Sequence, residues 1–251
     1  MTTIRSERRY ELKYLVHHTQ AAKLANALAA YMRPDKHGDG HGGYLVTSLY
    51  YDTAGYKAYW DKIDGHKNRR KLRVRIYGDQ TVTPETRCFI EIKQRLDRAI
   101  QKRRVVLPYG AAAELDQIDD LLDASSEEER PILEEVEYLY RALRLQPTCV
   151  VSYQRRAFEG CDYDPGLRVT FDTNLKYRTL ELNLFANGQA TDHYFLPPDW
   201  CIMEVKINHR APYWLTEVIG MHECVVRRVS KYCAALEHSR VVLSRQVHPN
   251  L

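Results

Sequence analysis

Several segments of this sequence carry a charged residue at every second position. The clearest is KLRVRIY, residues 71–77, in which Lys71, Arg73 and Arg75 alternate with aliphatic residues. Because the side chains of a β-strand point to opposite faces with a period of two, this segment has one apolar face and one face with three cations. A chain with several such strands must cover one face and find an environment for the other, which restricts its possible folds.

Eight segments have the composition and alternation of β-strands. They occupy residues 9–16, 44–53, 71–77, 88–95, 101–107, 148–158, 166–175 and 200–208. Helices are predicted at residues 20–32, 54–65, 212–222 and 230–246, and a helical insertion in two pieces is predicted at about 111–145. Because no repeat of fixed period and no low-complexity linker interrupts the sequence, we expect a single domain over residues 1–251, of the α+β class.

The polar faces of the other predicted strands hold charges of both signs. They contribute Glu11 with Lys13, Glu91 with Lys93, Lys102 with Arg104, Arg168 with Asp172, and Glu204 with Lys206. Arg155 and Arg156 are adjacent, so only one of them can share the face of its neighbours. For any single strand, this pattern fits an antiparallel sheet with a solvated face on which opposite charges pair.

Eight such strands together favour a different arrangement. The edges of the sheet need closure or cover, and the predicted helices supply apolar surface that can pack outside it. If the helices cover the apolar faces, the charged faces must point inward. We therefore expect a closed antiparallel eight-stranded β-barrel with a charged lumen and with the helices packed outside.

A lumen of this kind predicts its own ligand. Cations confined in a narrow space repel one another, so they need anions or water nearby. Arg and Lys suit phosphate oxygens, and single carboxylates among them suit Mg²⁺ or Mn²⁺, which complete their coordination with phosphate oxygens and water. The residues alone therefore predict a metal-bound chain of phosphates as the ligand.

Composition excludes several other classes of protein. A net charge of +4 is too small to indicate a nucleic-acid-binding protein. The six cysteines include no C-x-x-C pair, so neither a zinc site nor a disulfide framework is indicated. No apolar run approaches the roughly 18 residues of a transmembrane segment, and the N-terminus lacks the apolar core of a signal peptide. We expect a cytoplasmic protein without a transmembrane segment.

At these charged strands the sequence resembles the VTC domain family. This family comprises polyphosphate polymerase domains related to the catalytic subunit of the vacuolar transporter chaperone complex, within the CYTH or triphosphate tunnel metalloenzyme superfamily. The matching stretches are RYELKYLV, YYDT, LRVRIYG, FIEIKQR, SYQRRAFEG, LRVTFDTNL, IMEVKI and VSKYCAAL. They occur in the family's order between about residues 9 and 238, and their specificity lies in the ordered set.

The resemblance implies a tunnel of eight antiparallel strands that binds ATP and extends inorganic polyphosphate with a divalent metal, Mn²⁺ or Mg²⁺. By motif position, catalytic roles are implied for Arg73, Arg75, Lys93 and Arg168. Substrate binding is implied for Lys13, Lys102, Arg104, Arg155 or Arg156, Lys206 and Lys231. Glu204 resembles the metal ligand, and Glu11 and Glu91 are further candidates. No nucleic-acid partner is implied.

One departure from the superfamily bears on the reaction. Hydrolytic CYTH members begin with a Glu-x-Glu-x-Lys strand, whereas this chain has Arg9, Glu11 and Lys13 at those positions. The missing carboxylate weakens the case for a hydrolase and favours the polymerase branch. Two alternatives stay open: a hydrolase of tripolyphosphate or other short polyphosphates, and a non-catalytic polyphosphate-binding sensor.

Overall fold

The architecture is a single curled antiparallel sheet with helices on both of its faces. The computed structural model describes residues 9–38, 41–97, 99–185, 193–208 and 210–242. All eight predicted strands are confirmed, and two short strands, β2 and β9, accompany them. The strands are β1 Arg9–His17, β2 Met32–Pro34, β3 Gly43–Asp52, β4 Asn68–Tyr77, β5 Arg87–Leu96, β6 Ala99–Pro108, β7 Gln146–Gly160, β8 Arg168–Arg178, β9 His193–Tyr194 and β10 Trp200–Asn208.

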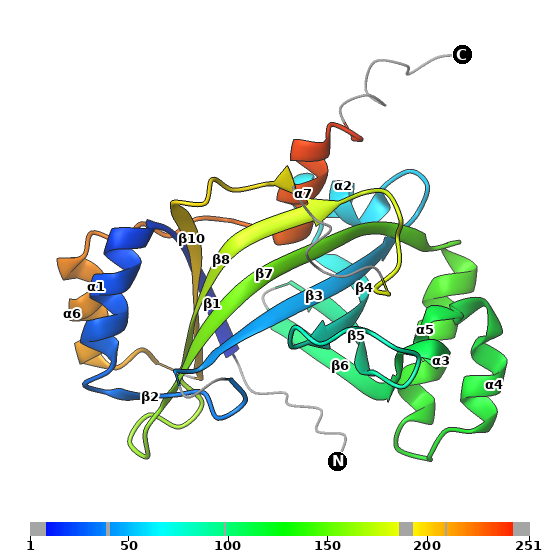
Figure 1. The fold of residues 1–251 in the computed structure, drawn as a ribbon, viewed down its shortest axis with the longest axis horizontal. Coiled ribbons are helices and arrows are strands. Elements are labelled where there is room, and N and C mark those ends of the chain that lie inside the picture. Colours follow the sequence, from blue (N-terminus) through cyan, green and yellow to red (C-terminus); the bar gives the residue numbers. More distant parts are fainter. Residues whose placement is uncertain (1–8, 39–40, 98, 186–192, 209, 243–251) are drawn as a thin grey trace.

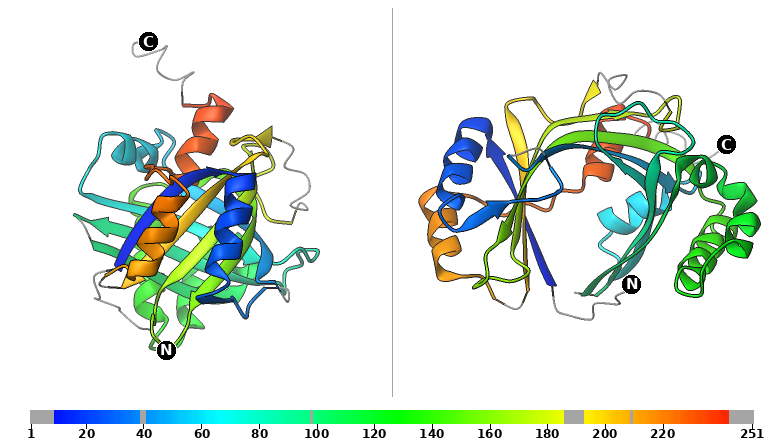
Figure 2. Two further views of the ribbon diagram at one scale, coloured as in Figure 1. Left: turned by 90° about the vertical axis from the view of Figure 1, so that its left-hand side faces the viewer. Right: turned by 60° about the horizontal axis from the view of Figure 1, so that its bottom comes forward.

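The sheet does not close into a barrel, so that part of the prediction is wrong. The strand order is β1-β10-β8-β7-β3-β4-β5-β6, and within the described residues no pairing joins β1 to β6. The segment after residue 224 occupies the outer edge of β1 instead: Tyr14 bridges Val226, and the Arg227 N–H donates to the Lys13 carbonyl at 2.7 Å. Because these backbone groups are taken, they cannot pair with β6. The sheet therefore curls into an open arch (Figure 2).

Seven helices lie in the described part of the chain. They are α1 His18–Leu28, α2 Lys57–Ile63, α3 Tyr109–Ala113, α4 Ile118–Asp123, α5 Arg130–Ala142, α6 Tyr213–Met221 and α7 Lys231–Ser239 (Figure 1). The insertion at 111–145 is helical as predicted, in shorter pieces that include a 3₁₀ turn at Leu115–Gln117. The last helix is shorter than predicted because Arg240 adopts a left-handed conformation, with φ 58°, that ends it. Positions 243–246 of that prediction lie outside the described residues.

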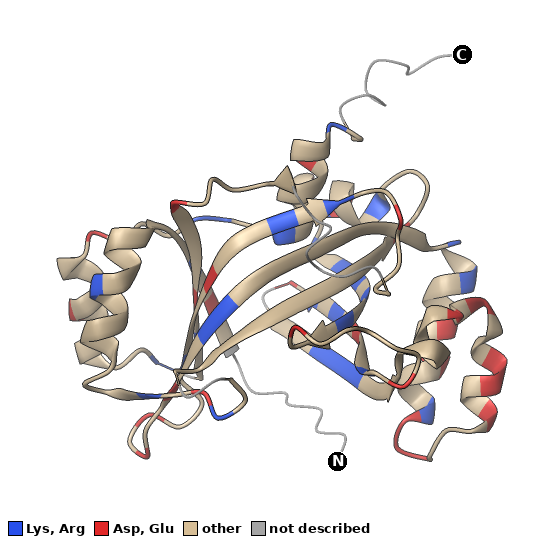
Figure 3. Ribbon diagram, viewed as in Figure 1, with Lys and Arg blue, Asp and Glu red and all other residues tan. Residues whose placement is uncertain are grey.

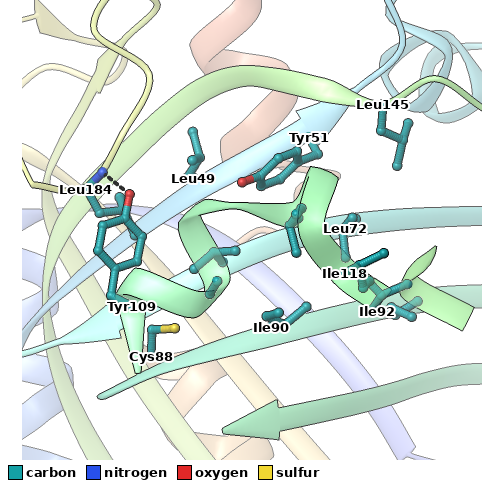
Figure 4. Close-up of a cluster of buried hydrophobic side chains, with 14 of the residues drawn as sticks. Leu49, Tyr51, Leu72, Cys88, Ile90, Ile92, Tyr109, Ile118, Leu145 and Leu184 are labelled. Atoms are coloured by element: carbon teal, nitrogen blue, oxygen red, sulfur yellow. Dashed lines mark hydrogen bonds between the residues drawn. The ribbon is translucent and has the colours of Figure 1, made fainter. Parts of the chain in front are cut away.

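Two sets of helices cover the convex face of the sheet. At one end, α1 and α6 bury the apolar sides of β1, β10 and β8, with Leu24, Met203 and Leu215 in the shared core. At the other end, α3 to α5 bury those of β4 and β5, where Leu72, Ile90 and related side chains meet (Figure 4). The charged positions of the strands therefore face the concave side, as expected from the alternation.

The helices α2 and α7 pack on the concave side, which corrects the expectation that all helices lie outside. Val46, Val151 and Ile202 point into the arch and form a core with Tyr59 of α2 and Tyr232 of α7. Figure 2 shows both helices beneath the arch. The concave face is thus divided into an apolar end covered by α7 and a charged part that holds the candidate site.

Acidic residues are concentrated elsewhere, on the helices α4 and α5 (Figure 3).

Candidate functional site

Arg73 and Arg75 of β4 point into the arch and converge on one buried carboxylate, Glu91. Arg73 binds Glu91 through Nε at 2.8 Å and Nη2 at 2.6 Å. Arg75 lies 3.8 Å from the same carboxylate and donates to the Ser48 hydroxyl at 2.9 Å. Lys102 of β6 also contacts Glu91, whose side chain is only 1% exposed. Because β4, β5 and β6 are adjacent in the sheet, their inward positions bring these groups together.

A second centre lies across the arch, on β10. Glu204 lies 3.1 Å from Lys13 and 2.7 Å from Lys231, and at greater distance it contacts Arg155 at 3.7 Å and Lys206 at 3.9 Å. Lys13 is the direct cross-strand partner of Glu204, whereas Lys231 enters from α7. One carboxylate is therefore surrounded by cations from four separate elements.

Asp172 of β8 adds a further carboxylate to the second centre. Arg155 grips it with two parallel hydrogen bonds, at 2.6 and 2.7 Å, and Lys231 lies 2.6 Å from its second oxygen. Asp172 is fully buried. The fork geometry fixes the Arg155 guanidinium, because two bonds to one carboxylate leave it little rotational freedom.

The two centres are joined across the open side of the sheet. Lys93 of β5 donates to Glu11 of β1 at 2.8 Å, and Glu11 also lies 3.7 Å from Lys13. Strands β1 and β5 are not neighbours in the sheet, so this ion pair spans the interior of the arch. Within the described residues, no backbone hydrogen bonds join β1 to β5, so this side-chain ion pair is what connects the Glu91 and Glu204 centres there.

We refer to these inward-facing groups as the concave charge cluster. It comprises Lys13, Lys71, Arg73, Arg75, Lys93, Lys102, Arg155, Lys206, Lys231, Glu11, Glu91, Asp172 and Glu204. Its cations outnumber its carboxylates by more than two to one. Such an excess in a partly buried space attracts anions strongly, because water screens it poorly.

The carboxylates of the cluster are held in their ionised form. Burial opposes the charge of Glu11, but Lys93 and Lys13 outweigh it and lower its pKa to about 2. The pKa of Glu204 lies well below its ordinary value despite burial, because Lys13 and Lys231 favour its charge. Arg155 and Lys231 likewise lower the pKa of Asp172 against the effect of burial. These groups are therefore acceptors, and not proton donors, near neutral pH.

Two lysines of the cluster hold their protons weakly. Burial lowers the pKa of Lys206 to about 7, and the attraction of Glu204 and Glu11 offsets this effect only in part. Burial lowers the pKa of Lys102 to about 8, with Glu91 acting in the opposite direction. An anion that approached these amines would favour their charged forms.

Three predicted residues lie outside the cluster. Arg168 binds Glu159 at 2.8 Å, the Tyr44 hydroxyl at 3.0 Å and the buried Asp35, at the end of the arch away from α7. Arg104 is exposed, with its guanidinium 5.0 Å from the centre of the Phe89 ring. Arg156 is exposed on the convex face over Phe158, so the choice left open in the sequence falls on Arg155. The side chain of Arg9 lies outside the described part of the structure.

Two members of the cluster were not among the predicted site residues. Asp172 lies on the same strand face as Arg168, as the alternation of the sequence already indicated. This alternation was sufficient to include Asp172 among the candidate site residues. Lys71 also lies on the predicted cationic face, but it contacts no carboxylate among the described residues. It lies 3.3 Å from the Ser230 hydroxyl and over the Tyr232 ring at 4.8 Å. Its position therefore depends on α7.

A buried carboxylate outside the cluster holds α7 in place. Asp52 accepts hydrogen bonds from the Ala58 N–H at 2.8 Å, the Tyr59 N–H at 3.2 Å and the Tyr232 hydroxyl at 2.6 Å. It thus ties the end of β3 to the start of α2 and to α7. Burial raises its pKa, and these hydrogen bonds counteract that rise. Because Lys231 is adjacent to Tyr232, Asp52 also fixes the position of a cluster lysine.

The carboxylates fit a divalent cation in pairs. Among the described residues no three Asp, Glu, His or Cys side chains are grouped as a metal site, so Glu11, Glu91 and Glu204 do not form one. However, Glu204 and Glu11 both contact Lys13, and Glu204 and Asp172 both contact Lys231. Mg²⁺ needs only one or two protein carboxylates when phosphate supplies other oxygens. Either pair therefore suits the expected ion.

Fold and site together define an α+β protein with a concave, cation-rich site suited to a polyanion. The family described as VTC domain matches residues 8–239. This chain therefore belongs to the VTC domain family. No curated protein matches it. In the described part of the chain, no helix is both apolar enough and long enough to cross a membrane.

Among solved structures, one similar chain is described as a candidate adenylate cyclase from Bacillus halodurans. It is 14% identical, the match covers 89% of this chain and 93% of that chain, and the TM-score is 0.48.

Proposed function

We propose that this VTC-domain chain is a metal-dependent polyphosphate polymerase, which transfers the γ-phosphoryl group of ATP to the end of a growing polyphosphate chain. Family membership supports a function related to nucleotide triphosphates or polyphosphate. The observation that carries the proposal is the concave charge cluster, in which cations from six strands and α7 converge on few carboxylates. Phosphoryl transfer requires in-line positioning and charge neutralisation more than a protein nucleophile, and this cluster supplies the cations for charge neutralisation.

The proposed roles follow from position in the arch. Arg73, Arg75 and Lys93 would bind the phosphates of the donor, because they project into the arch from β4 and β5, where they contact Glu91 and Glu11. Lys13 and Lys231 would bind the acceptor end near Glu204. The acceptor phosphate is already an anion at neutral pH, so no general base is needed. The oxygens of the polyanion would add to those of the carboxylates as hydrogen-bond acceptors for these cations.

The proposed metal is Mn²⁺ or Mg²⁺, held by Glu204 with either Glu11 or Asp172. When bound, such an ion neutralises charge on non-bridging phosphate oxygens. Glu91 would serve a different purpose, since it orients Arg73 and Arg75 from the other side of the arch. Arg168 would help to neutralise the phosphates from the end of the arch, where Asp35 and Glu159 hold its side chain.

The test is product analysis. Purified protein is incubated with ATP and Mn²⁺, with and without a short polyphosphate primer, and products are separated by chain length on a gel. We expect a ladder that grows with time and that Glu204→Gln abolishes. Glu134→Gln is the matched control, because Glu134 is half-exposed on α5 and pairs with Arg130 far from the cluster. A polymerase is excluded if wild-type protein yields no products longer than the primer.

A hydrolase of short polyphosphates is the second candidate, and the position of α7 favours it. Because α7 and α2 cover one end of the concave face, the site suits a short phosphate chain that enters from the other end or from the open side. In the same assay, a hydrolase would shorten tripolyphosphate and release phosphate. Tight binding without turnover would instead indicate a polyphosphate sensor.

A further inference from the structure

An aromatic cluster lies at the end of the arch opposite α7. Tyr44, Tyr77 and Phe89 project from the neighbouring strands β3, β4 and β5 on the concave side, and each is partly exposed. The ring centres of Tyr77 and Phe89 are 5.3 Å apart, and those of Tyr44 and Tyr77 are 5.8 Å apart, both edge to face. We call these three residues the aromatic rim.

Two exposed arginines flank the outer ring of the rim. The guanidinium of Arg104 lies 5.0 Å from the centre of Phe89, and that of Arg87 lies 5.7 Å from it. Within the described residues neither forms a salt bridge with a carboxylate. Both arginine side chains are exposed to solvent, whereas the arginines of the charge cluster are buried or partly buried and contact carboxylates.

The rim continues directly into the charge cluster. Along β4 the inward positions are Tyr77, Arg75 and Arg73, separated by steps of about 7 Å. The Arg75 guanidinium lies 5.8 Å from the Tyr77 ring centre. From the end of the arch inward, an aromatic ring is therefore followed by two cations. A nucleoside triphosphate has a matching order, because its flat base suits the aromatic ring and its chain of phosphates suits the cations.

We propose that the aromatic rim is the subsite for the base of a nucleoside triphosphate whose phosphates bind Arg75 and Arg73. Bases bind proteins by stacking on aromatic rings and on guanidinium planes, and both surfaces are present here. This inference rests on the proposed function, and it adds the orientation of the donor: base at the rim, γ-phosphate toward Glu204. The rim thereby distinguishes a nucleotide from an inorganic phosphate chain, which has no base.

The test compares ATP with inorganic tripolyphosphate, because the two differ in the base and ribose. Binding of each is measured by calorimetry in EDTA, which prevents metal-dependent turnover, for wild type and for Phe89→Leu. Because the variant loses the stacking of one base, we expect ATP affinity to fall about tenfold. Tripolyphosphate affinity should stay within about twofold, since Phe89 carries no charge.

Three further variants separate the loss of base stacking from other effects of substitution. Phe89→Trp keeps a stacking surface and should keep ATP affinity. Arg104→Gln should weaken ATP more than tripolyphosphate, and it tests the subsite even if Phe89→Leu unfolds on melting analysis. Tyr138→Leu is the matched control, because Tyr138 is 62% exposed on α5, away from the arch. It should change neither affinity.

The outcomes separate this inference from the proposed function. If Phe89→Leu and Arg104→Gln leave ATP binding unchanged, or weaken both ligands equally in folded protein, the rim is not a base subsite. The polymerase proposal would survive that result. If wild type binds neither ATP nor tripolyphosphate, the proposed function itself fails, and the base subsite fails with it.

Discussion

At the scale of the residue, the few carboxylates of the cluster are the partners of its buried cations in the free protein. Glu91 is held by Arg73, Arg75 and Lys102, and Glu204 by lysines from β1 and α7. The free protein thus satisfies its buried cations with its own anions. Removal of one carboxylate should therefore destabilise the free protein, and a bound phosphate chain should compensate for that loss.

Glu91→Gln tests this expectation. Loss of one partner leaves buried cations unpaired, so we expect the free energy of unfolding to fall by about 3 kcal/mol. Tripolyphosphate should restore more stability to the variant than to wild type, because its oxygens replace the lost carboxylate. Thermal melting with and without tripolyphosphate checks both effects, with Glu134→Gln as control. Equal stabilisation of the two proteins would contradict the replacement.

The two weakly protonated lysines predict a pH dependence of binding. Lys206, with a pKa of about 7, and Lys102, with a pKa of about 8, are partly or mostly neutral at pH 8. A bound phosphate chain favours their charged forms and raises both pKa values, so binding at pH 8 should take up protons. Affinity for tripolyphosphate should therefore fall as the pH rises from 6 to 9.

Calorimetry at pH 8 in buffers of different ionisation enthalpy measures this uptake directly. At pH 5.5 both lysines are already charged, so their contribution should disappear. Lys206→Met should reduce the uptake at pH 8. Binding that releases protons, or that is independent of pH between 6 and 9, would show that these amines do not face the ligand.

At the scale of the element, α7 is the helix on which the site most depends. It supplies Lys231 to Glu204 and Asp172, and its Ser230 cap holds Lys71. Its own position depends on Asp52, which joins it to β3 and α2. Two short sequence stretches, YYDT and VSKY, are therefore linked in space by one buried hydrogen bond.

Tyr232→Phe removes that hydrogen bond and little else. Asp52 loses a partner in a buried position, which should cost about 1–2 kcal/mol of unfolding free energy. Because Lys231 is the neighbouring residue, tripolyphosphate affinity should fall as well. Chemical denaturation and calorimetry measure the two effects, and Tyr138→Phe on the exposed face of α5 is the control. Unchanged stability would mean that Asp52 does not hold α7.

At the scale of the whole molecule, the open side of the arch is bridged by charge and not by backbone. The Lys93–Glu11 pair crosses it, and the excess of cations lies on both sides. Long-range attraction of a polyanion into such a site depends on ionic strength, because salt screens it within about 8 Å at physiological concentration. The charge of the whole molecule is small, so this attraction is local to the arch.

Salt should therefore weaken binding in proportion to the cluster charge. Raising NaCl from 50 to 500 mM should lower tripolyphosphate affinity at least about tenfold. The dependence should be shallower for Lys93→Met and unchanged for Phe89→Leu, which removes no charge. A titration series at increasing NaCl checks these slopes. Equal slopes for wild type and Lys93→Met would exclude Lys93 from the binding site.

Strand alternation was sufficient to predict which side chains face the arch. It placed Arg73, Arg75 and Glu204 on inward faces, because the period of two is a local property of extended backbone. It could not choose between Arg155 and Arg156, since a register is defined only by the neighbouring strand. Nor could it pair Lys93 with Glu11, because these residues meet across the arch without sharing any strand contact.

The sequence by itself determined the strands, the charged faces and, through its ordered motifs, the family. These features depend on local spacing and composition, which a single chain displays along its length. Tertiary structure decided that the sheet stays open and that α7 lies inside it. Closure requires two distant edges to pair, and the edge of β1 is already bound by Val226 and Arg227. Residues 226–227 thus occupy an edge that β6 would need for closure. They lie more than 200 residues after β1 in the chain, so this competition leaves no local trace in the sequence.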